Sequence, residues 1–202
     1  MLGSKTLIRL DINGGAGNQT QLVSGMLEAE PSLTAALRSN TALSSIDLKA
    51  TGIFSDATAA EALIRSLTAH PTMSDLCLSK NPVAGADRTR IGASLGALVA
   101  ANAPPLTRLD LSGCNLCDEC LGPLVDALKV NTNLGVLICS GNTMSEMFVL
   151  KRRLPAVLAN TGLHTLELVS FGDAGGATQS LRVLEELVDL RFTARIARHL
   201  AD

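Results

Sequence analysis

The sequence is nearly devoid of aromatic residues. Of its 202 residues, four are phenylalanine and none is tryptophan or tyrosine, so aromatics make up 2%. Stacking of bases on aromatic rings is therefore nearly excluded as a mode of binding. A basic surface is missing too, since 17 Lys and Arg are balanced by 19 Asp and Glu, for a formal net charge of −2. The sequence predicts no nucleic-acid partner.

Long apolar segments are absent as well. No run approaches the roughly 18 to 20 apolar residues of a transmembrane helix. No basic segment followed by an apolar one lies between Met1 and Leu10, as a secretion signal would require. The five cysteines are an odd number and fall at positions typical of a core or a loop. We therefore expect no membrane partner and a reduced setting, cytoplasmic or nuclear, of which we favour the cytoplasm.

Leucine is the abundant residue, with 35 positions, and it recurs in a fixed pattern. The segments Leu106–Leu116 and Leu134–Met144 are apolar at offsets 0, 3, 5 and 10 and have Cys114 or Asn142 at offset 8. The same apolar spacing at offsets 0, 3 and 5 begins at six places: Leu7, Leu43, Met73, Leu106, Leu134 and Leu163. All eighteen residues at these three offsets are apolar. A chain that is 47% apolar gives this by chance about once in a million.

Polar residues recur at two further positions of the pattern. Offset 8 holds a polar residue or Cys in the middle four units, where we expect a buried ladder that hydrogen-bonds the turn backbone: Thr51, Asn81, Cys114 and Asn142. The outer units have Gly15 and Phe171 there. A second set lies three residues before the next unit: Asn40, His70, Asn131 and Asn160. The residues upstream of this set have helical periodicity, so each unit is predicted to be a strand, a turn, a helix and a return loop.

The motif L-x-x-L-x-L-x-x-(N/C)-x-L with a helix and a period of 28 to 29 resembles the leucine-rich repeats of the ribonuclease-inhibitor class, over about residues 6–174. This class includes ribonuclease inhibitor, the activator of the Ran GTPase, tropomodulins, the actin-regulating CARMIL proteins and Nod-like receptor sensor domains. The segments 32–43 and 124–134 are most similar to tropomodulin or CARMIL repeats. The resemblance implies one α/β domain over residues 1–202, a right-handed solenoid of about six repeats with an inner parallel sheet and outer helices.

The two ends of the chain depart from the pattern. Few residues precede Leu7 to cap the first strand, so either the chain is a fragment of a larger protein or a partner covers this edge, and we favour the fragment. Residues 175–202 are predicted to form a capping helix, because Leu181, Leu184, Leu187 and Val188 make an apolar stripe at helical spacing. An alternative is a seventh strand at residues 187–192, where apolar residues repeat the spacing 0, 3, 5.

No pattern of residues indicates catalysis, a metal or a cofactor. The series Cys114-x-x-Cys117-x-x-Cys120 resembles a metal motif, but no fourth Cys or His ligand lies near it in sequence. No nucleophile motif accompanies the histidines, and no phosphate-binding loop is present. The best alternative is a GTPase activator that supplies Arg88 or Arg90 to the nucleotide site of another protein. We predict that the protein is not an enzyme.

The strand residues that point away from the core are the candidate binding surface. Side chains alternate on a strand, so offsets 2, 4 and 6 face outward, and offset 4 is acidic in four of six units. The predicted partner-binding residues on this concave face are Arg9, Asp11, Asp47, Asp75, Cys77, Arg108, Asp110, Ile138 and Glu167. Alternatively, the acids only keep the inner face hydrated. The apolar residues of the C-terminal half, Ile138 among them, are expected to add an apolar spot.

The sequence therefore predicts a protein–protein interaction module that binds its partner through the concave sheet or the rim loops. Actin or another cytoskeletal or signalling protein is the expected partner by resemblance. A sensor or scaffold repeat domain of a larger signalling protein is the alternative, besides the GTPase activator.

Overall fold

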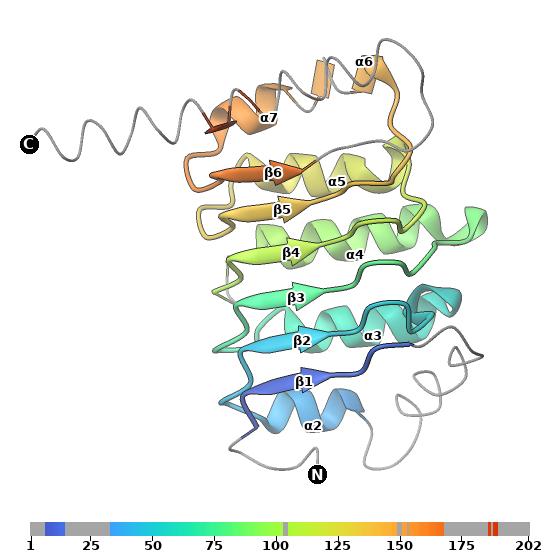
Figure 1. Cartoon of the computed structure of the whole chain (residues 1–202), viewed down its shortest axis with the longest axis vertical. Helices are drawn as coiled ribbons and strands as arrows, with labels where there is room; N and C mark the ends of the chain where they lie inside the picture. Colours follow the sequence, from blue (N-terminus) through green and yellow to red (C-terminus); the bar gives the residue numbers. More distant parts are fainter. Residues whose placement is uncertain are drawn as a thin grey trace, which may run out of the picture.

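The computed structural model of the chain describes residues 7–14, 33–102, 105–148, 151–152, 154–167, 186 and 188–189. Within these ranges, six short strands form one parallel sheet, ordered β1-β2-β3-β4-β5-β6 (Figure 1). The strands are β1 Arg9–Asp11, β2 Ser45–Asp47, β3 Asp75–Cys77, β4 Arg108–Asp110, β5 Val136–Ile138 and β6 Thr165–Glu167. Each strand pairs with the next one along the chain, as the spacing of the leucine pattern predicts.

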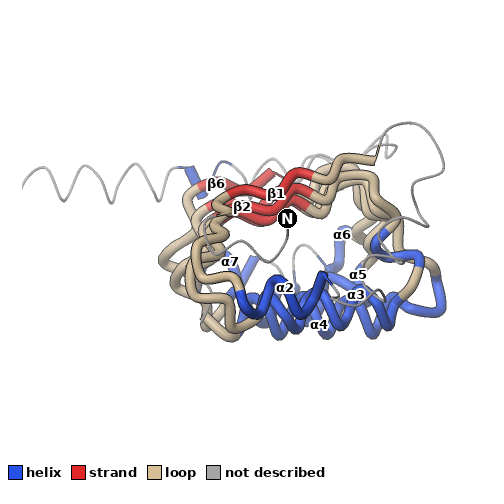
Figure 2. Tube along the Cα trace, turned by 90° about the horizontal axis from the view of Figure 1, so that it is seen from below, coloured by secondary structure: helices blue, strands red, loops and turns tan. Residues whose placement is uncertain are grey.

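Helices connect the strands and lie on one side of the sheet, so the described residues form two layers (Figure 2). The α-helices are α2 Leu33–Ser39, α3 Ala57–Leu67, α4 Arg88–Ala100, α5 Asp118–Leu128, α6 Glu146–Phe148 and α7 Leu154–Ala159. Two 3-10 helices, η1 Ile53–Ser55 and η2 Gly85–Asp87, precede α3 and α4. Helices α2 to α5 pack each against the next. Among the described helices, none has the length and apolar content needed to cross a membrane.

The apolar residues at offset 3 fix the register of the sheet. They are Cα partners of one another across every strand pair, for example Leu76 with Leu109 and Leu137 with Leu166. In β2 to β6 these central residues are at most 4% exposed. A slip by one residue would turn the charged residues on either side into the core. The alternation therefore excludes a slip by one residue.

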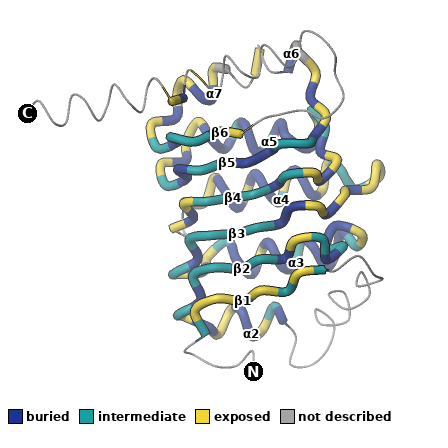
Figure 3. The backbone as a smooth tube through the Cα atoms, viewed as in Figure 1, coloured by how far each residue is buried: buried dark blue, intermediate teal, exposed yellow. Residues whose placement is uncertain are grey.

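An apolar core fills the space between the sheet and the helices (Figure 3). From the sheet side, the residues at offsets 0, 3 and 5 are buried in every unit from Leu43 to Leu163, as far as the described residues extend. From the helix side, α3 adds Leu63 and Leu67, and α5 adds Leu121. The N-terminal unit is more open, because Leu7 and Leu10 are only half-buried against the same core.

The buried polar ladder predicted at offset 8 is confirmed. Asn81 donates from Nδ2 to the carbonyls of Leu48 and Leu78 at 2.9 and 2.8 Å, and its Oδ1 accepts from the N–H of Gly52 at 2.7 Å. Thr51 donates to the carbonyl of Leu48 at 2.9 Å. These side chains satisfy turn backbone groups that water cannot reach. The outer positions, Gly15 and Phe171, lie outside the described residues.

The second polar set satisfies the loops that lead into the strands. Asn160 donates from Nδ2 to the carbonyls of Leu128 and Asn131, and its Oδ1 accepts from the N–H of Leu163 at 2.7 Å. Asn131 repeats this arrangement one unit earlier, with Nδ2 at 2.7 Å from the carbonyl of Val99. Amide side chains suit this position because each has two donors and an acceptor.

His70 occupies the same position with fewer contacts. Its Nδ1 accepts from the N–H of Thr72 at 3.4 Å, while Nε2 is buried and makes no hydrogen bond of normal geometry within the described residues. The ring is 2% exposed. Burial lowers the pKa of His70, and the backbone of Asn40 offsets this in part. An imidazole therefore fits this position less well than an amide does.

We expect His70→Asn to stabilise the fold and to flatten its pH dependence. The unfolded chain binds a proton at His70 below about pH 6.5, whereas the folded chain does so only at lower pH. The contribution of His70 to stability is thus fully present above about pH 6.5 and is lost as the pH falls through the folded-state pKa. Urea unfolding on both sides of about pH 6.5 measures this. The control, His164→Asn, should keep the decline of the parent, and an equal decline in His70→Asn would contradict the prediction.

The predicted C-terminal cap lies mostly outside the described residues. Of residues 175–202, only Glu186, Val188 and Asp189 are described, and all three are helical. Val188 is completely buried and belongs to the apolar core. Helical backbone at Val188 and Asp189 is compatible with a capping helix and not with a strand at these two residues. The other members of both patterns, Leu187, Leu190 and Phe192, are not described.

Candidate functional site

The side of the sheet that faces away from the helices carries two columns of side chains, which we name the open sheet face. The first column follows strand position one: Arg9, Ser45, Asp75, Arg108, Val136 and Thr165. The second follows strand position three: Asp11, Asp47, Cys77, Asp110, Ile138 and Glu167. The register thus brings all nine predicted site residues onto one face, in the predicted order. The residues of both columns are half-buried or exposed, apart from the buried Ile138.

A groove of about 270 Å³ lies on the N-terminal part of the open sheet face, over β1 to β4. Of the predicted residues it is lined by Arg9, Asp47, Asp75, Cys77, Arg108 and Asp110. Four further lining residues, Ser45, Ile46, Lys49 and Ser79, were not among the predicted site residues. Ser45 lies at offset 2 and Lys49 and Ser79 at offset 6, so all three occupy positions that strand alternation turns outward.

Charges of both signs meet in this groove. Arg108 Nε lies 3.8 Å from Asp75 Oδ1 on the neighbouring strand, and both side chains are about two-fifths exposed, so the pair contributes little to stability. Asp47 Oδ1 accepts from the N–H of Lys49 at 3.0 Å, and Asp110 Oδ1 accepts from the N–H of Ser112 at 2.9 Å. These hydrogen bonds orient both carboxylates, which lie in the same groove as the basic side chains of Lys49 and Arg108.

Cys77 lies between these two carboxylates in the second column. Its Sγ is 3.2 Å from Ser79 Oγ, and the residue is half-buried. Burial raises the pKa of the Cys77 thiol, the contacts with Ser79 lower it, and the negative charges of Asp110 and Asp47 add to the rise. The thiolate is the reactive form of a cysteine. Cys77 is therefore accessible but not activated, and it is a neutral group at the floor of the groove.

The C-terminal part of the open sheet face differs from the prediction at Ile138. Its side chain is only 7% exposed, so the expected apolar contact surface is wrong at this residue. Alternation directs the side chain of Ile138 away from the core, but packing around it removes it from solvent. Glu167 on β6 is exposed, as expected. Because β5 has no charged residue, Glu167 is separated from the charges of the groove by a neutral strand.

The cysteine series does not gather into a metal site. Cys114 belongs to the polar ladder, where Sγ lies 3.1 Å from the carbonyl of Leu78, and burial raises its pKa to about 12. Cys139 is buried in the core as well. Across the part of the chain that the structure describes, no group of three or more His, Cys, Asp and Glu residues is placed to hold a metal ion.

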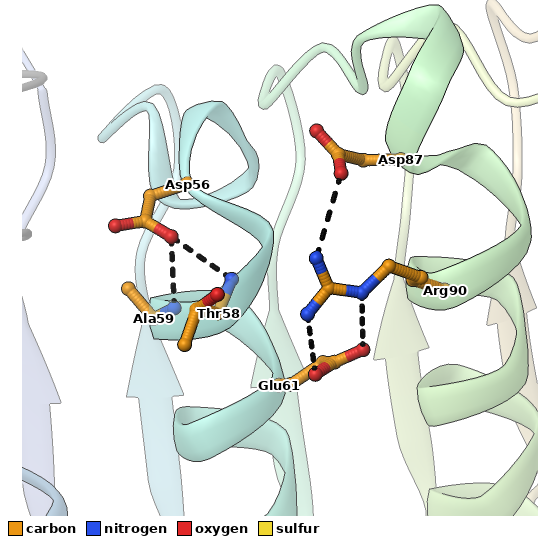
Figure 4. A network of polar contacts seen from close by, with 6 residues as sticks. All are labelled: Asp56, Thr58, Ala59, Glu61, Asp87 and Arg90. Carbon is orange, nitrogen blue, oxygen red and sulfur yellow. Dashed lines mark hydrogen bonds and ion pairs between the residues drawn. The ribbon is translucent and has the colours of Figure 1, made fainter.

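Arg90, one of the two candidate arginine fingers, is engaged between two helices (Figure 4). Its Nε and Nη2 donate to the two carboxylate oxygens of Glu61 on α3 at 3.1 and 3.0 Å. Asp87 lies 3.8 Å from Nη1. Asp56, drawn in the same view, caps α3 by accepting from the N–H groups of Thr58 and Ala59. The bidentate pair gives Arg90 a structural role in holding α4 against α3.

Comparison with known proteins identifies the fold. No protein-family model and no curated protein sequence matches the chain. Among solved structures, the tropomodulin C-terminal domain from Caenorhabditis elegans has a TM-score of 0.65 at 13% identity, with 92% of this chain and 100% of that chain covered. Leiomodin-1 actin-binding site 2 has a TM-score of 0.60 at 11% identity, with 83% of this chain and 94% of that chain covered. The chain therefore has a fold like that of these leucine-rich-repeat domains.

Proposed function

We propose that this protein is a non-catalytic interaction domain that binds actin, or an actin-like cytoskeletal protein, through the open sheet face. The observation that carries the proposal is the likeness to leiomodin-1 actin-binding site 2, which extends over 94% of that chain. In this chain, the same fold has a charged groove of about 270 Å³ on the open sheet face. We place the protein in the cytoplasm on the same grounds.

The proposal includes the finer architecture. Residues 1–202 are one curved solenoid of six leucine-rich repeats of the ribonuclease-inhibitor class, with the open sheet face as its concave side and residues 175–202 as its cap. The recurrence of the leucine pattern and the strand-by-strand register support this. The site is then formed by Arg9, Asp11, Asp47, Asp75, Cys77, Arg108, Asp110 and Glu167, extended by Lys49 and Ser79. We leave Ile138 out of the site because its side chain is buried.

The electrostatics of the groove predict what the partner offers. Asp47 and Asp110 are oriented by backbone N–H groups, so a partner cation can approach them without reorganisation. Lys49 and Arg108 line the same groove and favour acidic groups beside that cation. Mixed charge of this kind sets orientation and association rate more than it sets affinity. We therefore expect a partner surface of mixed charge with a lysine or arginine at its centre.

We expect the purified chain to bind actin and to change the rate of filament growth, and Asp47→Asn with Asp110→Asn to weaken binding about tenfold or more. A hydrogen bond to a charged group is worth about 1.5–3 kcal/mol, and 1.4 kcal/mol is a factor of ten in Kd. Asparagine keeps the acceptor oxygens for Lys49 and Ser112, so the fold should be retained. Calorimetric titration with actin monomers measures Kd, and fluorescently labelled actin reports filament growth.

A matched control changes the same net charge on the helix side. Glu119→Gln with Ala97→Lys shifts the net charge by about two units in the positive direction, as the double asparagine variant does, at residues exposed on α5 and α4. This control should bind like the parent. Equal weakening in both variants would assign the effect to net charge and not to the groove. A parent chain that binds neither monomers nor filaments would overturn the proposal, and faster GTP hydrolysis by a partner, lost in Arg88→Ala or Arg90→Ala, would favour a GTPase activator instead.

A further inference from the structure

Two cysteines share the first turn of α5. Cys117 is the N-cap residue, with extended backbone angles φ −119° and ψ −176°, and Cys120 is the third residue of the helix. The N–H of Leu121 donates to the carbonyl of Cys117 at 3.0 Å and closes the turn that contains both. The side chain of Cys117 adds to the rise in the pKa of Cys120, so the two thiols are close enough to interact. Residues three apart on a helix are neighbours on its surface, so the first turn of α5 brings the two cysteines to the same side.

The two thiols differ in access. Cys117 is half-exposed, whereas Cys120 is 1% exposed. Burial raises the pKa of Cys120, and the backbone of Cys117 and the charge of Arg88 offset part of this rise. In thiol–disulfide exchange, an accessible thiol attacks the disulfide, and a second thiol next to it resolves the mixed disulfide that forms. Cys117 and Cys120 suit these two roles. Cys77 is half-exposed too, but its side-chain contact is the hydroxyl of Ser79.

The surroundings of the pair act on it in opposite directions, and burial, which raises the pKa of Cys120, is the largest of these effects. The N-terminal end of a helix of eleven residues, such as α5, attracts negative charge. Arg88 begins the adjacent α4, and its Nε is buried without a hydrogen-bond partner among the described residues. Its positive charge acts on Cys120. Two acids, Asp118 and Glu119, lie between the cysteines; the carboxylate of Asp118 accepts from the N–H and hydroxyl of Ser145, and Glu119 is exposed to solvent. A neighbouring cation and a helix N-terminus are the features that make cysteine pairs redox-active.

We propose that Cys117 and Cys120 form a reversible disulfide, and that the first turn of α5 is a thiol–disulfide exchange site for small disulfides such as oxidised glutathione. The Cys117 thiolate attacks one sulfur of oxidised glutathione, the sulfur–sulfur bond breaks, and one glutathione leaves as the thiolate and takes a proton from water. Cys120 then loses its proton to water, and its thiolate attacks Cys117 Sγ and releases the second glutathione. The protein loses two electrons and two protons, and one glutathione disulfide becomes two thiols.

The test equilibrates the full chain in glutathione buffers of increasing oxidation, quenches with acid, alkylates the free thiols and measures intact mass. We expect the parent to lose two alkylatable thiols and to retain no glutathione. We expect Cys120→Ala to hold one glutathione on Cys117, because the resolving thiol is gone. Cys117→Ser should keep Cys120 reduced, and serine is a favoured N-cap residue, so this variant should fold. Circular dichroism checks the fold of each variant.

The control is Cys77→Ser, which removes the other half-exposed thiol and should form the internal disulfide like the parent. Peptide fragmentation of the oxidised parent locates the bond independently of any variant. Three outcomes would overturn the proposal: a parent that stays reduced in fully oxidised glutathione, a parent that ends with glutathione on a single cysteine, or a Cys117→Ser variant that still loses two thiols.

Discussion

Replacing Gly92 with alanine is expected to destabilise the fold by about 3 kcal/mol, which lowers Tm by roughly 6–12 °C in a domain of this size. Gly92 lies on α4, where a Cβ atom would stand 2.5 Å from the carbonyl oxygen of Cys120 and 2.7 Å from its Cα. Both atoms are backbone of α5, so no side-chain rotation relieves the contact. The helices would have to separate.

Helix propensity alone predicts the opposite effect of Gly92→Ala on stability. Alanine is better than glycine in a helix interior by about 1 kcal/mol, so without the contact the substitution would stabilise. Gly96, one turn further along α4, has the same close approach to Pro123, at 2.8 Å from its Cβ. The two glycines thus form a flat strip that lets α5 pack directly on α4. Thermal unfolding followed by circular dichroism measures the loss.

Gly85 provides the matched control. A Cβ atom at Gly85 would meet nothing within 4 Å, so Gly85→Ala should be neutral or stabilise by a few tenths of a kcal/mol. If Gly92→Ala unfolds at the temperature of the parent, the two helices are further apart than described and the packing argument fails.

Asn142→Ala is expected to have a comparable effect, a loss of about 3–5 kcal/mol, because it leaves buried backbone groups without partners. The side chain is 2% exposed. Its Nδ2 donates to the carbonyls of Leu111 and Cys139 at 2.9 Å each. Its Oδ1 accepts from the N–H groups of Cys114 and Leu116 at 3.1 and 3.0 Å. Each orphaned group costs about 1–3 kcal/mol, with partial relief where the backbone relaxes.

Two further variants separate hydrogen bonding from the loss of volume. Cysteine fills this ladder position at Cys114, where Sγ donates to a carbonyl, so Asn142→Cys should be less destabilising than Asn142→Ala. Asn133→Ala removes one partly buried bond, from Nδ2 to the carbonyl of Asn102 at 2.9 Å, and should cost about 1 kcal/mol. Urea unfolding ranks the three variants. Equal losses for alanine and cysteine at residue 142 would show that the ladder does not act through its hydrogen bonds.

The candidate site was largely predictable because it depends on local rules. Strand alternation and a buried leucine at offset 3 leave one register, and that register aligns Asp11, Asp47 and Asp110 in one column. The same rules turn offset 6 outward, so Lys49 and Ser79 could have been named as site residues too. The groove itself was not predictable, because its volume depends on how side chains such as Arg108 lean toward their neighbours.

By itself, the sequence determined the order of the strands, their register, the polar ladder at Asn81 and Asn142 and the outward face of the sheet. These follow from a period of two in strands and from the need to satisfy buried backbone groups, both of which act within one unit. Only the tertiary structure decided the pairing of Arg90 with Glu61, the burial of Ile138 and the approach of Gly92 to Cys120. The contacts of Arg90 and Gly92 join residues about 30 positions apart. All three features depend on how closely neighbouring units pack, which the sequence of a single unit does not specify.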